Sequence, residues 1–200
     1  MHFIIIFLIC VCAYNIVIHI SKLITIYFYD CKEIQTYLPR NIQAYACNTQ
    51  PMCSGDFFTL TSPVIFLRYS KDTDFILHHE IAHITCNHTT KRLIVSSLIV
   101  ALINSVGKLS IFSTTLLFFV IAPIISSKFL GHKFETEADA IACDKCLEQT
   151  LIEAISYLND LEKNTDSANN NSIFDYHPAV SDRIRFIKEQ ILVKRNGSTK

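Results

Sequence analysis

Three residues of this chain, His79, Glu80 and His83, have the types and the spacing of a hydrolytic metal centre. Histidines four positions apart lie on one face of an α-helix, so both imidazoles can bind the same zinc ion. The glutamate that follows the first histidine can act as a general base toward a water molecule activated by the metal. The pattern H-E-x-x-H is short, so its surroundings must decide between a metal centre and a helix face with two solvated histidines.

The neighbouring residues favour a buried helix. An acidic segment, Asp72–Asp74, can cap a helix start, and it predicts a helix from about Thr73 to about Lys91. Burying two histidines and a glutamate without partners or a metal is unfavourable, so burial favours the metal centre. The apolar residues around the motif are Phe75, Ile76, Ile81, Ala82 and Ile84.

A catalytic zinc ion takes three protein ligands and leaves one position for water, so a third ligand is needed. Glu135 and Asp139 are four positions apart and therefore share a helix face. We expect Glu135 to be the third ligand and Asp139 to accept a hydrogen bond from an imidazole. Glu137 should point about 160–200° away, into solvent. Without the H-E-x-x-H helix, a plain acidic helix surface would be the better interpretation.

Three further histidines lie near these motifs and are left out of the predicted site. His78 points about 100° away from His79 on a helix. His88 is five positions beyond His83, one too many for a neighbour on the same helix face. His132, three positions before Glu135, is also left out.

The composition predicts contact with a membrane. Half of the 200 residues are hydrophobic and only 18% are charged. An almost continuous apolar segment runs from Phe3 to Tyr29, long enough to span a bilayer, so we expect residues 1–30 to be an uncleaved N-terminal membrane anchor. A second apolar segment, 93–128, is interrupted at Asn104–Lys108. It can form a membrane hairpin of two helices or an apolar helical pair packed on the catalytic domain.

The remainder, 31–200, is expected to be one domain, into which the segment 93–128 is inserted. Strand-like pieces at 42–47, 57–61 and 64–67 precede the metal helix, and 30–40 reads as a connector. A small sheet there offers an edge to which an extended peptide can add. Later apolar periodicity predicts helices at 149–163 and 181–193. The expected fold is mainly α with a small β-sheet (α+β), a zincin-like metallopeptidase domain.

Net charge and cysteine content narrow the possible functions further. Lys+Arg and Asp+Glu both number 18, so no basic field exists to attract nucleic acid. We interpret the eight cysteines as packing thiols, although Cys47 and Cys53 could pair in an oxidising compartment. Cys143 and Cys146 form a lone C-x-x-C pair, expected in the middle of a helix, which is too few ligands for a structural zinc site.

Three motifs in a fixed order resemble those of the M48 metallopeptidases, a family that includes the CAAX prenyl protease and HtpX. They are HEIAH, then Glu-x-x-x-Asp within FETEADA, then His177-Pro178 with Arg183 six positions beyond the histidine. The resemblance extends over about Asn41 to Ile191. It implies that His79, His83 and Glu135 bind one zinc ion per chain and that Glu80 is the general base.

The same resemblance gives roles to three more residues. Asp139 would orient a zinc ligand, and Arg183 would brace the active-site carboxylates. His177 would stand near the transition state as a donor to the tetrahedral oxyanion. These roles complete the site that the spacing of the first two motifs predicts.

The expected function is that of a zinc-dependent, membrane-associated endopeptidase. Its partners would be a polypeptide substrate, with membrane and misfolded proteins among the candidates, and membrane lipid. One alternative is a membrane-anchored, non-catalytic metal-binding or scaffold protein with a vestigial peptidase site, which the intact Glu80 disfavours. Another is a thiol redox protein that uses Cys143 and Cys146.

Overall fold

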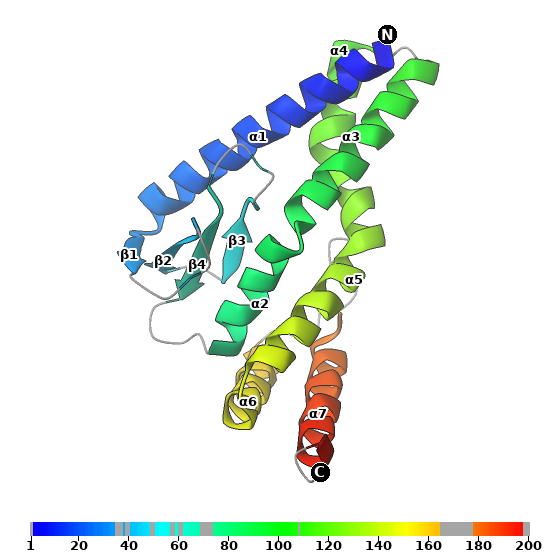
Figure 1. Ribbon diagram of the computed structural model, residues 1–200. Helices are drawn as coiled ribbons and strands as arrows, with labels where there is room; N and C mark the ends of the chain where they lie inside the picture. Colours follow the sequence, from blue (N-terminus) through cyan, green and yellow to red (C-terminus); the bar gives the residue numbers. More distant parts are fainter. Residues whose placement is uncertain are drawn as a thin grey trace.

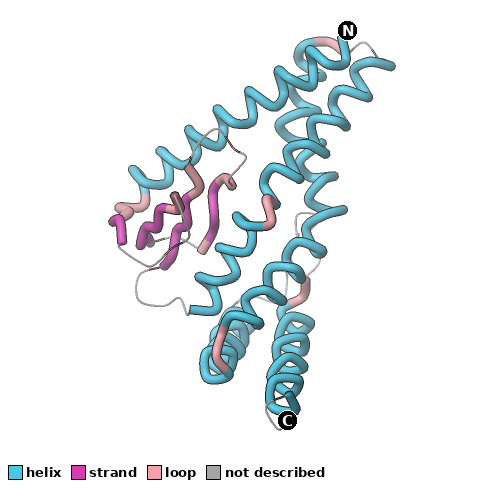
Figure 2. Tube along the Cα trace, viewed as in Figure 1, coloured by secondary structure: helices cyan, strands magenta, loops and turns pink. Residues whose placement is uncertain are grey.

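The computed structural model describes residues 2–34, 38, 41–48, 51–56, 59, 62–68, 74–107, 109–164 and 178–197. These residues form a mainly helical protein with a small mixed sheet (Figures 1 and 2). In chain order the elements are α1 (His2–Phe28), β1 (Lys32–Ile34), β2 (Gln43–Cys47), β3 (Met52–Ser54), β4 (Val64–Arg68), α2 (Asp74–Thr85), α3 (His88–Gly107), α4 (Ile111–Leu116), the π-helical η1 (Leu117–Ile121), α5 (Ala122–Lys145), α6 (Glu148–Asn164) and α7 (Val180–Gly197).

Three long apolar helices of the described chain come together at one end of the molecule. Stretches long and apolar enough to cross a membrane lie at Phe3–Phe28, His88–Gly107 and Phe112–Lys145. In Figure 1, α1, α3 and the α4–η1–α5 segment converge near the N-terminus, away from α6 and α7. The prediction of an apolar N-terminal helix followed by an internal hydrophobic hairpin is therefore confirmed.

The contacts between these helices bury only part of their apolar surface. A cluster of buried residues joins α1 to the hairpin, while large side chains face outward elsewhere. Leu102 on α3 is 61% exposed and Phe112 on α4 is 79% exposed. Such an apolar exterior is typical of helices that face lipid. The buried cluster comprises Cys10, Val100, Leu117, Phe118 and Ala122.

The described strands form a four-stranded sheet in the order β1-β2-β4-β3. The central pair, β2 and β4, is parallel, and each outer strand pairs antiparallel with its neighbour. The predicted strands at 42–47 and 64–67 correspond to β2 and β4. The prediction for 57–61 falls mostly outside the described residues. The edge strand β3 lies next to α2 (Figure 1).

The short outer strands were not predicted. β1 lies in the segment 30–40, which was expected to be a connector, and its sequence Lys-Glu-Ile has no apolar alternation. A disulfide joins Cys31, just before β1, to Cys47 at the end of β2. The possible pairing of Cys47 with Cys53 does not occur, because Cys47 is bonded to Cys31 and Cys53 is a free thiol. The interpretation of all eight cysteines as packing thiols is therefore wrong for Cys31 and Cys47.

The predicted helix from Thr73 to Lys91 is in fact two helices. α2 ends at Thr85, and Asn87 takes the left-handed backbone conformation, with φ of 56°. Asparagine tolerates this conformation better than most residues do, so it can end one helix and start the next in a new direction. Asp56 accepts hydrogen bonds of 2.7 Å from both the backbone nitrogen and the hydroxyl of Thr90, in the first turn of α3.

The C-terminal helices pack against α2 and α5. The predicted helices at 149–163 and 181–193 correspond to α6 and α7. Together with α2 and α5 they bury a second cluster of apolar side chains. Cys143 and Cys146 belong to this cluster, but α5 ends at Lys145, so the pair straddles a helix end instead of lying mid-helix. The core members on α6 and α7 are Leu151, Ala154, Leu158, Ile184, Ile187 and Ile191.

Candidate active site

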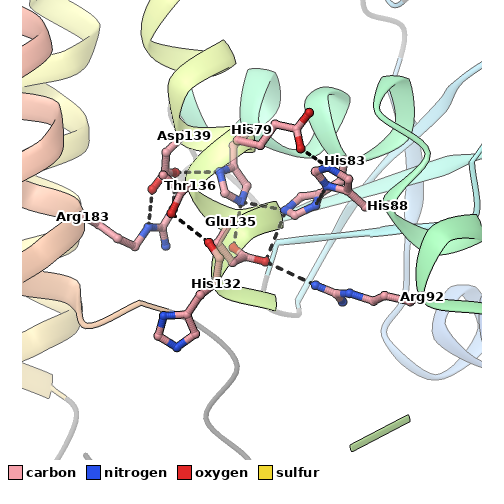
Figure 3. A network of polar contacts seen from close by, with 10 residues as sticks. His79, His83, His88, Arg92, His132, Glu135, Thr136, Asp139 and Arg183 are labelled. Atoms are coloured by element: carbon pink, nitrogen blue, oxygen red, sulfur yellow. Dashed lines mark hydrogen bonds and ion pairs between the residues drawn. The ribbon is translucent and has the colours of Figure 1, made fainter. Parts of the chain in front are cut away.

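Two facing helices bring His79, His83 and Glu135 together. The histidines come from α2 and the glutamate from α5, and all three are buried (Figure 3). The Nε2 atoms of the two histidines are 3.1 Å apart. Glu135 places Oε2 at 3.3 Å from Nε2 of His79 and Oε1 at 3.5 Å from Nε2 of His83. Three potential ligand atoms therefore converge on one point.

The geometry of this group fits a zinc ion. Tetrahedral zinc with bonds of about 2.0–2.1 Å to nitrogen and oxygen holds its ligand atoms about 3.3 Å apart. The three contacts of 3.1, 3.3 and 3.5 Å are close to that spacing. Two histidines and one glutamate are also a known ligand set of hydrolytic zinc, with one position left for water or substrate.

The Nδ1 side of the His79 ring contacts the carboxylate of Asp139, which in turn binds the guanidinium of Arg183. Its Nδ1 lies 2.8 Å from Oδ1 of Asp139. Arg183, on α7, donates to both oxygens of Asp139, from Nε at 2.8 Å and from Nη2 at 2.7 Å. Burial disfavours a charged His79, but its hydrogen bonds to Asp139 and Glu135 outweigh burial and raise the pKa of His79 to about 9. A metal that binds Nε2 of His79 at neutral pH would therefore displace a proton.

The second histidine is backed by another histidine, which sequence reasoning had left out. Nδ1 of His83 lies 2.7 Å from Nδ1 of His88, the first residue of α3. The His88 ring stacks on Phe134, with centroids 4.1 Å apart, and its Nε2 lies 3.4 Å from Oε2 of Glu137. Glu137 has a side chain that is 38% exposed, as expected, but the sequence did not predict its contact with His88.

Arg92, which was not predicted as a site residue, also contacts the proposed ligand Glu135. Nη2 of Arg92 lies 3.8 Å from Oε1 of Glu135, and its guanidinium lies over the Phe134 ring at 5.6 Å from the centroid. Arg92 directly precedes the apolar segment that begins at residue 93. A charged residue at the end of an apolar span is the sequence signal that could have found it.

Glu80 occupies a buried position on α2, close to the edge strand. Its exposed fraction is 8%. Cys53 on β3 is its neighbour: burial, followed by the charge and hydrogen bond of Glu80, raises the pKa of the Cys53 thiol well above its usual range. Glu80 therefore lies next to β3 as well as one position beyond the proposed ligand His79.

Three other histidines were considered in the sequence: His177, which was predicted to belong to the site, and His78 and His132, which were not. His177 lies outside the described residues. His78 is half-buried and His132 exposed. Figure 3 shows the His132 ring pointing away from the ligand group.

Comparison with known families and structures identifies the chain's relatives. The family model for peptidase family M48 matches residues 33–191. The fold is similar to the crystal structure of Ste24p from S. mikatae, with a TM-score of 0.55 and 18% sequence identity. That match covers 88% of this chain and 58% of Ste24p, so the chain spans less than two thirds of that protein. No curated protein matches the chain significantly. With most of its length matched by the family model, the chain belongs to peptidase family M48.

Proposed function

We propose that this protein is a zinc-dependent, membrane-associated endopeptidase with His79, His83 and Glu135 as the ligands of one zinc ion. The observation that carries the proposal is the convergence of these side chains from α2 and α5, at the spacing that zinc requires. Membership of a metallopeptidase family supports the reaction class. The buried carboxylate of Glu80, one residue beyond the first ligand, supplies the base.

Each of the proposed site residues has a separate role in the reaction. Zinc, when bound, polarises the scissile carbonyl and makes water a better nucleophile at neutral pH. Glu80 takes the proton from the attacking water and later delivers it to the leaving amine. Asp139, fixed by Arg183, holds His79 in the tautomer that leaves Nε2 free for the metal. His177 donates to the developing oxyanion in this proposal.

We further propose that residues 1–30 anchor the protein in a membrane and that 31–200 form the peptidase domain. The inserted hairpin, 93–128, packs against α1 and adds two spans. α3 begins at His88, which contacts the proposed ligand His83, so the site would lie at the membrane surface. A site so placed suits polypeptide segments that lie in or near the bilayer, including those of misfolded membrane proteins.

The alternative is a membrane-anchored scaffold that binds metal without catalysis, and Glu80→Gln separates the two. The purified, zinc-loaded protein is incubated with an unfolded substrate such as casein, and its zinc content is measured in parallel. We expect wild type and variant to bind zinc equally. Loss of the general base should slow cleavage by about 10²–10⁴-fold. Equal cleavage by both proteins would contradict the mechanism, and no cleavage by zinc-loaded wild type would favour the scaffold.

A further inference from the structure

A second group of metal-ligating side chains lies beside the first. The Cys86 thiol, the His88 imidazole and the Glu137 carboxylate have donor atoms within 4.8 Å of one another. Cys86 belongs to the turn between α2 and α3, His88 begins α3, and Glu137 is on α5. Nε2 of His88 is 3.4 Å from Oε2 of Glu137. None of these three residues belongs to the proposed catalytic ligand set.

The chemistry and access of this group suit zinc. A thiolate, an imidazole and a carboxylate are all common zinc ligands, and the thiolate excludes magnesium and calcium as preferred ions. His88 is fixed, being 2% exposed and stacked on Phe134. Glu137 is 38% exposed at its side chain and lines a cavity of about 960 Å³ between α3 and α5. The group is therefore open to solvent on the side of Glu137, while His88 is buried.

We propose that Cys86, His88 and Glu137 form a second zinc site whose occupancy opposes occupancy of the catalytic one. The two sites share one hydrogen bond, the 2.7 Å contact between Nδ1 of His83 and Nδ1 of His88. One of these atoms must donate a proton and the other must accept it, because two lone pairs at this distance repel. The position of that proton decides which site can bind metal.

The shared proton has two arrangements. When neutral His83 binds metal through Nε2, its proton is on Nδ1 and is donated to His88. Neutral His88 then carries its own proton on Nε2, where it points to Glu137, and that atom cannot bind a metal. When His88 binds metal through Nε2, its proton is on Nδ1 and is donated to His83, whose remaining proton then occupies Nε2. Each arrangement makes one Nε2 available and blocks the other.

Antagonism between two sites is reciprocal, so each metal weakens the binding of the other by the same factor. At low zinc concentration the catalytic site fills and the second group stays a hydrogen-bonded support for His83. At high zinc concentration the second site also fills, and His88 then donates its Nδ1 proton to His83. This weakens the binding of zinc at the catalytic site. Zinc would therefore inhibit the peptidase at concentrations above those that activate it. This last consequence rests on the proposed function, whereas the second site itself does not.

Cobalt(II) titration of the full-length protein tests the second site directly, because a cobalt–thiolate bond gives a charge-transfer absorption. Cys86→Ala removes the one thiolate of the site and leaves the catalytic ligands intact. Cys12→Ala is the matched control, since Cys12 is an exposed free thiol on α1. We expect wild type and Cys12→Ala to show the absorption and Cys86→Ala to lack it. An absorption that persists in Cys86→Ala, or is missing in wild type, overturns the second site.

His79→Ala tests the antagonism by disabling the catalytic site while keeping His83. We expect cobalt to bind the thiolate site at least about tenfold more tightly in this variant than in zinc-loaded wild type. Equal affinity in the two proteins overturns the antagonism. In peptidase assays, excess zinc should inhibit wild type but not Cys86→Ala, and equal inhibition of both contradicts the proposal. A protein without peptidase activity would still give the two cobalt results. Failure of the proposed function can therefore be distinguished from failure of the second zinc site.

Discussion

The Nδ1 atoms of His83 and His88 lie 2.7 Å apart, although the residues are five positions apart in the chain. On a continuous α-helix their side chains would point about 140° apart. The left-handed conformation at Asn87 ends α2 and lets α3 start in a new direction, which turns the His88 ring back toward the proposed metal ligands. The support of one proposed zinc ligand therefore depends on the backbone conformation at Asn87.

Replacing Asn87 should show this dependence. We expect Asn87→Gly to be close to neutral, because glycine adopts positive φ freely and Oδ1 of Asn87 has no hydrogen-bond partner among the described residues. Asn87→Ala should lower the free energy of unfolding by about 1–2 kcal/mol, because a Cβ without a polar group is strained there. Thermal unfolding in detergent measures the difference. Equal stability of both variants would show that the turn is not strained.

Weakening the support of His79 should reduce metal affinity. Asp139→Asn loses the charge that holds the imidazole and pairs with Arg183, so we expect the zinc dissociation constant to rise about 10–100-fold. Competition with a chelator measures this constant. Asp144→Asn, an exposed change on the same helix, is the control and should leave it unchanged. A small effect of Asp139→Asn would mean that packing alone orients His79.

Zinc binding should be strongly pH-dependent. The pKa of His79 in the metal-free protein is about 9, so zinc must displace a proton at any lower pH. We expect the apparent affinity to rise about tenfold per pH unit up to about pH 9 and then to level off. In Asp139→Asn the affinity should level off at a lower pH, because a main cause of the raised pKa is gone. A flat wild-type profile between pH 7 and 9 would contradict a protonated His79.

The same raised pKa has a consequence for the metal-free fold. A histidine whose pKa is higher in the folded state stabilises the protein fully below its unfolded pKa, which is about 6.5. That contribution is lost as the pH rises through about 9. We therefore expect metal-free protein to lose stability between about pH 6.5 and 9, and zinc to offset the loss. Unfolding curves at several pH values, with and without zinc, measure both effects.

Removing the cap of α3 should destabilise the whole junction. Asp56 is fully buried and accepts two hydrogen bonds from Thr90. Asp56→Ala leaves these donors without that acceptor, and we expect a loss of about 1–3 kcal/mol in the free energy of unfolding. Asp160→Ala, on the exposed face of α6, should change stability by less than about 0.5 kcal/mol. Similar losses in both would argue against a specific capping role.

Hydrophobic length and helical periodicity were enough to predict most of the helices. The apolar segments located α1 and the hairpin, and apolar spacing located α6 and α7. The short strands β1 and β3 were missed because three residues carry too little pattern. Each pairs with a longer strand, β1 with β2 and β3 with β4, and the disulfide between Cys31 and Cys47 also links β1 to β2.

Within the candidate site, sequence reasoning worked where one helix carried both partners. The four-residue spacings of His79 with His83 and of Glu135 with Asp139 place each pair on one face. Contacts between elements could not be derived this way. The approach of His88 depends on the turn at Asn87 and on Asp56, which caps α3 from 34 positions away.

Helix α3 connects the candidate site with the apolar helices at the other end of the molecule. The helix has 20 residues and is about 30 Å long, the thickness of a bilayer's hydrocarbon core. Its capped first turn carries His88, and its other end lies among the apolar helices. If α3 spans the bilayer as we propose, a thinner or thicker membrane changes its tilt. Tilting about the capped end would move His88 relative to His83, so the thickness of the membrane would act on the contact that supports this proposed ligand.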